Sequence, residues 1–469
     1  MLSNQKTQRL GEMPILKLIT ILSVPAMISM LVQSLYNVVD SIYVAKISED
    51  AITALSYAFP VQAFTMAFGL GLGIGANSIV SVKLGERRPE EASEAAQNGV
   101  FMAIMLGTFF AIFGYPISLL YFKLIIPASE TLIFKEALEY TAICISLTIF
   151  IYLQILIART LQATGRPTVP MFAQLIGAIS NIALDPLFIF TFKMGVKGAA
   201  IATVISQALA LIYALLVVKF QKQTIKLFSK TFKPNKKYIF SLIKVGLPAA
   251  IINCLFSLTT TVLNIILGQL SKSAVAVLGI YFKIQSFVFM PLFGLNQGTM
   301  PIFGYSFGAD NRQRFNKTFL YAIIISLVLG ISNTLLIQFA SLPILQLFSI
   351  KPGSETMKIG VEALTIISFS FIPACFSILA TAAFQSIGHA VQSAILSLSR
   401  QFIVLIPFTY IFINFTQLKL KGAWLAFPIS EVVTCLIFIP LFISTVNKAF
   451  IKHRKYLQIE KLNNDSSSV

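Results

Sequence analysis

The segment "PAMISMLVQSLYNVVDSIYVAKISEDA" at residues 25–51 returns later in the chain as "PAAIINCLFSLTTTVLNIILGQLSKSA" at residues 248–274. With the same offset of 223 positions, residues 25–85 align without a gap to residues 248–308, and 18 of the 61 pairs are identical. That offset also brings "LQATGRP" at 161 over "FQSIGHA" at 384, and an offset of 224 brings "VKGAAIATVISQ" at 196 over "LKGAWLAFPISE" at 420. A repeat of this length predicts two halves of similar structure.

Both halves are strongly apolar. Of the 469 residues 56% are hydrophobic and 12% are charged, against roughly 25% charged in ordinary soluble domains. Stretches of about 20 apolar residues, long enough to cross a bilayer as a helix, recur from end to end. We place twelve spans near 16–45, 51–81, 93–121, 136–158, 168–190, 196–218, 239–268, 275–306, 318–342, 360–383, 393–415 and 422–446. The sequence therefore predicts an all-α polytopic membrane protein rather than a soluble one.

The repeat divides these spans into two sets of six. Because six is even, both halves enter the membrane from the same side, which makes them parallel repeats related by an axis along the membrane normal. Transporters with a central binding cavity use this arrangement. We expect an N-terminal six-helix lobe at 1–218, a basic linker at 219–238, a C-terminal six-helix lobe at 239–446 and a tail at 447–469.

The net charge of +18 has a topological explanation. If the N-terminus is cytoplasmic, the inner segments carry 23 Lys and Arg residues and the outer loops carry 10. The positive-inside rule then places both termini in the cytoplasm. The most basic run, "KFQKQTIKLFSKTFKPNKK" at 219–237, is the central inner loop. Its charge suits anionic lipid headgroups, so we expect contact with membrane lipids and none with nucleic acid.

The repeat also separates shared positions from those unique to one half. Pro25 aligns with Pro248, and Gly71 and Gly75 align with Gly294 and Gly298. Shared small residues and prolines predict close helix contacts and tolerated bends within the membrane. An alternative role for Pro25 is a hinge that lets the first span bend during a transport cycle.

Two acidic residues break the symmetry. Asp40 aligns with Leu263, and Asp185 in "SNIALDPLFIF" faces no acid in the second half. Each lies about five residues before the outer end of its span, roughly 8 Å deep at the helical rise. Carboxylates at this depth suit a hard cation or a proton, although solvation near the headgroups is an alternative. Polar side chains expected at a similar depth are Tyr36, Tyr140, Asn181 and Thr203.

The remaining charges within spans have several interpretations. Lys244 and Arg400 lie near inner ends, from which they can extend to the interface. Lys283 could do the same at the outer side or line a cavity, and Glu431 aligns with Gln207 at a depth where a cavity role is one alternative. Four isolated cysteines indicate neither a disulfide nor a metal site, and the chain has no HExxH, GxGxxG or Walker sequence, so we expect no enzyme.

Five segments together resemble the multidrug and toxic compound extrusion (MATE) family over essentially the whole chain. They are "LYNVVDSIYVAKIS", "GIGANSIVSVKLGERRPEEA", "LQATGRPTVPMF", "NIALDPLFIF" and "GVKGAAIATVISQ", in this order. The likeness is to bacterial members with an aspartate in the first transmembrane helix. It implies a two-lobed bundle of twelve helices with a cation site in the N-terminal lobe. The matching residues are Asp40, Asn181, Asp185 and Thr203, with Tyr36 and Tyr140 as a surrounding network.

The resemblance implies a secondary active antiporter in the plasma membrane. Its cargo would be small amphipathic, often cationic, compounds, exported in exchange for sodium ions or protons. The coupling ion is the only cofactor expected; if it is sodium, Asp40, Asn181, Asp185 and Thr203 would bind it. Glu431 and Lys283 are candidates for the substrate cavity, and we expect a monomer. The alternative is a flippase for lipid-linked precursors, which requires cationic side chains in the cavity.

Overall fold

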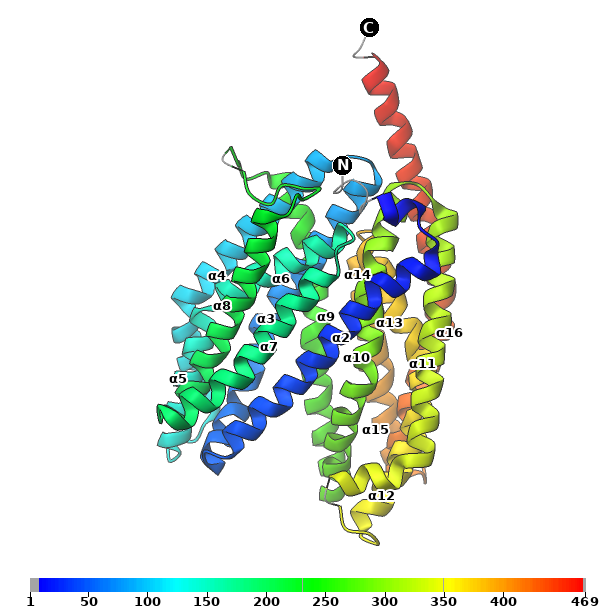
Figure 1. The fold of residues 1–469 in the computed structure, drawn as a ribbon. Helices are drawn as coiled ribbons and strands as arrows, with labels where there is room; N and C mark the ends of the chain where they lie inside the picture. Colours follow the sequence, from blue (N-terminus) through cyan, green and yellow to red (C-terminus); the bar gives the residue numbers. More distant parts are fainter. Residues whose placement is uncertain (1–7, 230, 349, 467–469) are drawn as a thin grey trace.

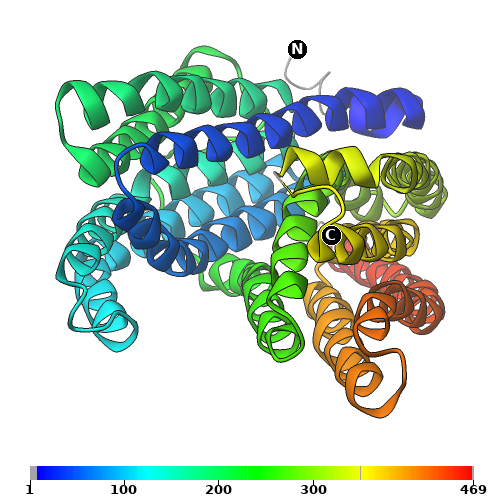
Figure 2. The same cartoon turned by 90° about the horizontal axis from the view of Figure 1, so that it is seen from below.

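The computed structural model describes residues 8–229, 231–348 and 350–466, and in these ranges all regular structure is helical. Figure 1 shows two bundles of long helices that converge at the end where both termini lie and diverge toward the other end. Figure 2 shows the same division from below. We refer to the bundles as the N-lobe (residues 15–220) and the C-lobe (residues 236–466).

The N-lobe is built from seven α-helices and one π-helical segment. They are α2 (Ile15–Ala45), α3 (Glu49–Gly85), α4 (Pro89–Ile125), α5 (Thr131–Ser146), α6 (Thr148–Ala163), α7 (Thr168–Pro186), η1 (Leu187–Thr191) and α8 (Gly195–Phe220). The C-lobe contains α9 (Lys236–Gly268), α10 (Lys272–Gly308), α11 (Arg312–Leu347), α12 (Glu355–Ser368), α13 (Phe371–Ser386), α14 (Ala390–Leu398), η2 (Ser399–Leu405), α15 (Ile406–Phe415) and α16 (Lys419–Ser466).

The helices account for twelve spans. Ten described helices are long and apolar enough to cross a membrane, and two bent pairs bring the number to twelve if each pair is one span. The pair α5 and α6 bends by 46°, and the pair α12 and α13 bends by 51°. The first break falls at Leu147 and the second at Phe369 and Ser370. Since Leu147 and Ser370 are 223 positions apart, the repeat extends to this irregularity. The twelve-helix fold predicted from the sequence is confirmed.

Glycines shared by the two halves form the contact between the lobes. Helix α3 of the N-lobe packs on α9, and α10 of the C-lobe packs on α2. A Cβ atom at Gly71 would overlap the carbonyl oxygen of Gly246, and one at Gly294 would overlap the backbone of Met27. Close approach of two backbones leaves no room for a side chain, which is the physical reason for glycine here.

Pro25 lies in the middle of this contact. It is internal to α2, which runs without a break from Ile15 to Ala45. Met27, two residues later, contacts Gly294, and Ser23, two residues earlier, contacts Gly298. The proline is therefore placed where α2 leans against α10. A hinge at Pro25 stays a prediction.

The last helix extends far beyond the span expected to end at 446. Helix α16 continues to Ser466 and projects from the bundle at the end bearing the termini (Figure 1). The ring of His453 stacks on Phe307 with centroids 4.6 Å apart, which fixes this extension to the end of α10. Nearby, Nε of Arg454 donates to Asp310 Oδ2 at 2.7 Å.

The basic linker follows the surface of the N-lobe. Nδ2 of Asn235 donates to Glu94 Oε1 at 2.7 Å, and the Asn235 backbone N–H donates to Asn98 Oδ1 at 2.9 Å. Gln97 Nε2 donates to the carbonyl of Lys226 at 2.9 Å. The linker is thus held against the first turns of α4.

Candidate functional site

The two aspartates that break the repeat meet inside the N-lobe. Asp40 lies in the last two turns of α2, and Asp185 lies near the end of α7, the helix packed beside it. Their carboxyl groups lie close enough to interact directly. Asp185 has no exposed surface, which argues against a headgroup-solvated position. Pro186 follows directly, and there α7 changes to the π-helical segment η1.

Asn181 joins the pair from one turn earlier on α7. Its Nδ2 donates to Asp185 Oδ1 at 3.2 Å and points to Thr203 Oγ1 on α8 at 3.5 Å. The spacing of four residues places Asn181 and Asp185 on one face of the helix. The structure therefore brings together Asp40, Asn181, Asp185 and Thr203, which come from three helices.

Three buried oxygen atoms at this site lack a hydrogen-bond partner. They are Oδ1 of Asp40, Oδ1 of Asn181 and Oδ2 of Asp185. A buried acceptor without a donor is costly, and two carboxylates in contact cannot both stay ionised without a compensating positive charge. A proton or a hard monovalent cation would provide both a partner for these oxygens and the compensating positive charge, because such cations bind carboxylate, amide and hydroxyl oxygens. The residues present therefore fit either coupling ion.

Tyr36 and Tyr140 lie in the shell around the acids, with two residues that the sequence did not single out for this role. Tyr36 is half-buried and lies near Asp40, Asp185 and Cys144. Gln62 lies beside Tyr140 and Cys144. The sequence signal at Gln62 is its identity with Gln285 at the repeat offset, which by itself indicates shared packing. Cys144, one turn after Tyr140 on α5, was taken for a small core hydrophobe.

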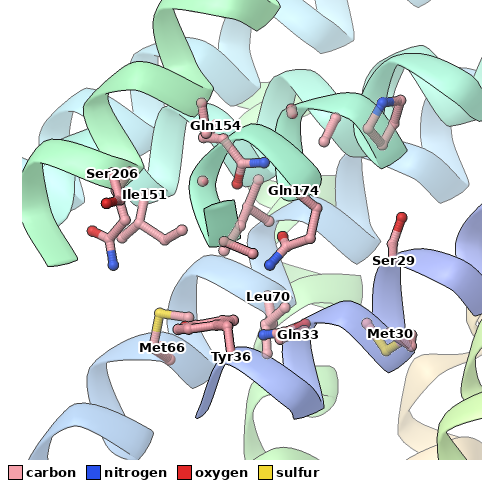
Figure 3. A pocket seen from close by; sticks show the side chains of 18 of the residues that line it. Ser29, Met30, Gln33, Tyr36, Met66, Leu70, Ile151, Gln154, Gln174 and Ser206 are labelled. Carbon is pink, nitrogen blue, oxygen red and sulfur yellow. The ribbon is translucent and has the colours of Figure 1, made fainter. Parts of the chain in front are cut away.

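A cavity of about 120 Å³ adjoins the acid site in the N-lobe. Tyr36, Asn181 and Thr203 form part of its lining, and in Figure 3 Gln33, Gln154 and Gln174 gather around the same space. Three further glutamines complete the amide lining, which then comprises Gln33, Gln154, Gln162, Gln174, Gln207 and Gln297. Arg159 of α6 also lines it, and among the described lining residues it alone carries a charge.

A second cavity, of about 360 Å³, occupies the corresponding place in the C-lobe. Its lining repeats the first one at the offset of 223 residues: Met30 and Asn253, Met66 and Phe289, Gln154 and Ser377, and Ala158 and Thr381 are such pairs. The repeat thus produces two corresponding cavities, one in each lobe, with different side chains in each.

The other candidates from the sequence fall in different places. Glu431 is buried in the C-lobe, where its Oε1 lies 3.3 Å from Nη1 of Arg400 and its Oε2 accepts from Ser377 Oγ at 3.4 Å. Arg400 lines the C-lobe cavity, so it does not extend to the interface as was favoured from the sequence. Lys283 is exposed, with its Nζ 6.0 Å from the centroid of the Phe348 ring, and it is absent from both cavity linings.

A bundle of twelve helices in two repeats, each with an internal cavity, is the architecture of a membrane transporter. The chain belongs to the MatE family, because the sequence profile of that family matches residues 25–187 and, a second time, residues 248–411.

Two curated relatives are named "Multidrug export protein MepA". The protein from Staphylococcus haemolyticus (strain JCSC1435) is 26% identical over 451 residues, which cover 96% of this chain and 98% of the relative. The protein from Staphylococcus aureus (strain NCTC 8325 / PS 47) is 29% identical over 316 residues, which cover 67% of this chain and 69% of the relative.

Solved structures show the same fold. One described as an outward-facing conformation of a multidrug resistance MATE family transporter superposes with a TM-score of 0.88 at 25% identity, covering 94% of this chain and 98% of that one. A MATE structure in the bent conformation gives 0.89 at 25% identity, covering 96% and 99%. A MATE structure in the straight conformation gives 0.89 at 26% identity, covering 94% and 98%.

Proposed function

We propose that the protein is a multidrug exporter that works as a secondary antiporter, releasing small amphipathic, often cationic, compounds in exchange for sodium ions or protons. The membrane would be the plasma membrane, with both termini in the cytoplasm as the distribution of Lys and Arg predicts. The names of the relatives support multidrug export. A monomer is the expected working unit, since each chain holds both lobes.

The contact between Asp40 and Asp185 is the observation that carries the proposal. A pair of buried carboxyl groups with unpartnered oxygens changes its charge when it takes up a cation. Asn181 and Thr203 belong to the acid site and also line the cavity of the N-lobe. Cargo in the cavity and the coupling ion at the acids would therefore bind at adjoining positions. Coupling requires that ion and cargo favour different states of the transporter. A cationic cargo and the coupling ion would compete for the negative charge of the pair, which supports that requirement.

A flippase for lipid-linked pyrophosphates finds less support. Such a ligand carries several negative charges and needs several cations. Lys283, the candidate from the sequence, does not line either cavity. In the described linings Arg159 stands alone in the N-lobe, and Arg400 is paired with Glu431 in the C-lobe.

The test is transport by the purified protein in lipid vesicles loaded with a fluorescent cationic dye. Dye movement is recorded with a sodium gradient alone, with a proton gradient alone and with neither. Export driven by one gradient identifies the coupling ion, and Asp40→Asn should abolish that gradient dependence. Equal dye movement with and without both gradients would refute antiport.

A further inference from the structure

Arg159 is held in a fixed position in the N-lobe. Its backbone carbonyl accepts from Asn77 Nδ2 at 3.0 Å. Its side-chain stem packs on Gly73 of α3, where an added Cβ would lie 2.8 Å from Arg159 Cγ. The stem and backbone are thus clamped between α3 and α6, while the residue lines the cavity with only 9% of its surface exposed.

The positive charge of Arg159 has no counter-charge in the part of the chain that the structure describes. Its side chain donates from Nη1 to the neutral Oε1 of Gln162 at 3.4 Å, and none of the ion pairs among the described residues includes it. It directly precedes the last turn of α6, and its side chain makes no hydrogen bond to the terminal carbonyls of that helix among the described contacts. A guanidinium stays charged in proteins and is costly to bury without a partner.

The C-lobe provides the comparison. In the corresponding cavity Arg400 is neutralised by Glu431 at 3.3 Å. The position that aligns with Arg159 is Ala382, so this charge belongs to the N-lobe alone. The two lobes therefore present cavities of different net charge, and the N-lobe cavity carries the uncompensated one.

We propose that Arg159 binds an anionic group of the cargo, specifically a carboxylate, so that carboxylate-bearing amphipathic compounds are exported through the N-lobe cavity. The inference rests on the export function proposed above and specifies its substrate class. A carboxylate accepts two parallel N–H bonds from a guanidinium, and the six glutamines around it accept or donate as the compound requires. At about 120 Å³ the cavity takes the charged end of a drug-sized compound, since whole-drug sites occupy about 300 to 1,000 Å³.

The other end of the cavity suits the cationic group of a zwitterion. The lining runs from Arg159 to Tyr36, Asn181 and Thr203, which adjoin the Asp40 and Asp185 pair. A compound with a carboxylate at one end and an ammonium group at the other would match both ends. Its cationic end would then compete with the coupling ion, and its carboxylate would be fixed by Arg159.

The experiment compares a rhodamine that has a free benzoate group with the methyl ester of the same dye. The two differ in one negative charge. Binding to the purified full-length protein is measured by fluorescence anisotropy, and transport is measured in vesicles. Arg159→Gln removes the charge, Arg159→Lys keeps it, and Lys123→Gln removes a positive charge from an exposed position on α4. Thermal unfolding of each variant shows whether it is folded.

Arg159→Gln should weaken binding of the acid about 10-fold, the scale of one charge-assisted bidentate pair, and leave binding of the ester within about 2-fold. Arg159→Lys keeps the charge and loses the bidentate geometry, so it should weaken binding of the acid less than Arg159→Gln does. Lys123→Gln should change binding of neither dye. Sodium benzoate should displace the acid from the wild-type protein and not the ester, which tests the site even if Arg159→Gln does not fold. Equal losses for both dyes, or no loss for the acid, would overturn the proposal. Failure of the wild-type protein to move either dye would instead count against export itself.

Discussion

Glu460, near the end of α16, forms an ion pair with Arg88 in the turn between α3 and α4. The contact with Glu460 raises the pKa of Arg88 above its ordinary value, so the guanidinium stays charged. Two turns earlier on α16, Arg454 bonds to Asp310 in the turn between α10 and α11. Arg87, beside Arg88, aligns with Asp310 at the repeat offset. One helix therefore holds the same turn in both lobes.

We expect Glu460→Lys to favour separation of the lobes at this end. A partly exposed ion pair contributes about 0.5–1 kcal/mol, so the population of the separated state should rise about 2- to 5-fold. Energy transfer between dyes on cysteines at Glu90 and Gln313, two exposed positions on α4 and α11, measures the separation. Glu460→Gln removes the ion pair and leaves Arg88 with its other partners Glu86 and Glu91, so it should give a smaller shift in the same direction. An unchanged distance in both variants would show that the pair does not hold the lobes.

Asp40→Asn and Asp185→Asn should each reduce gradient-driven dye export at least about 10-fold. The amide keeps the size of the carboxyl group and removes the charge that the coupling ion neutralises. Both variants should reach the membrane and unfold at no lower temperature than the wild type, since one of two contacting buried carboxyl groups is removed. Asp50→Asn, at an exposed position on α3, is the control and should transport normally. Undiminished export by either site variant would remove that residue from the site.

Glu431→Gln should change which compounds are exported without ending dependence on the gradient. It leaves Arg400 unpaired beside the C-lobe cavity, so cationic cargo should be disfavoured several-fold and neutral cargo much less. Adding Arg400→Gln removes the excess charge and should restore the cationic dye. Dye efflux with and without the gradient checks both variants. Loss of gradient dependence in Glu431→Gln, together with its retention in Asp40→Asn, would move ion coupling to the C-lobe.

Gly71→Ala should destabilise the protein by about 1–3 kcal/mol, the usual cost of overpacking. The new methyl group would overlap the carbonyl oxygen of Gly246. Gly294→Ala, its counterpart in the repeat, should cost a similar amount. Gly279→Ala on α10 is the matched control, because nothing lies within 4 Å of its added Cβ, and better helix propensity should make it neutral or stabilising by up to about 1 kcal/mol. Thermal unfolding in detergent gives the comparison, and equal behaviour of all three would contradict the tight contact.

The membrane orientation can be checked with single cysteines in a variant that lacks the four native ones. An impermeant maleimide added to intact cells should label Ser48→Cys, in the turn between α2 and α3, and should not label Ser229→Cys in the basic linker. After the cells are opened both should react. Labelling of Ser229→Cys from outside would reverse the assignment of the two faces; the neighbouring Lys230 lies outside the described residues.

The sequence predicted most of the fold, because the two halves of the repeat can be aligned directly. It placed the shared glycines at contacts and separated Asp40 and Asp185 from the common scaffold. It could not show that Gln62 and Cys144 surround the acids, because a shared glutamine and an apolar cysteine have the same pattern in a packed core. Arg159 belongs by sequence to the inner basic residues, and its contact with Gly73 and its place in the cavity lining appear only in the folded chain. Neither feature has a local sequence signal.

The glycine contact at Gly71 lies far from the start of α3, so a small rotation at the contact would move that end by a larger distance. From Gly71 back to the start of α3 at Glu49 the helix measures about 33 Å, at about 1.5 Å per residue. A rotation of the lobes by about 10° around that contact would displace the far end by about 6 Å, while the backbones at the contact would barely move. Such a rotation would convert a small movement at the contact into a larger change of access at the far end. The backbones of Gly71 and Gly246 meet directly at this contact, so neither residue has a side chain that the rotation would compress.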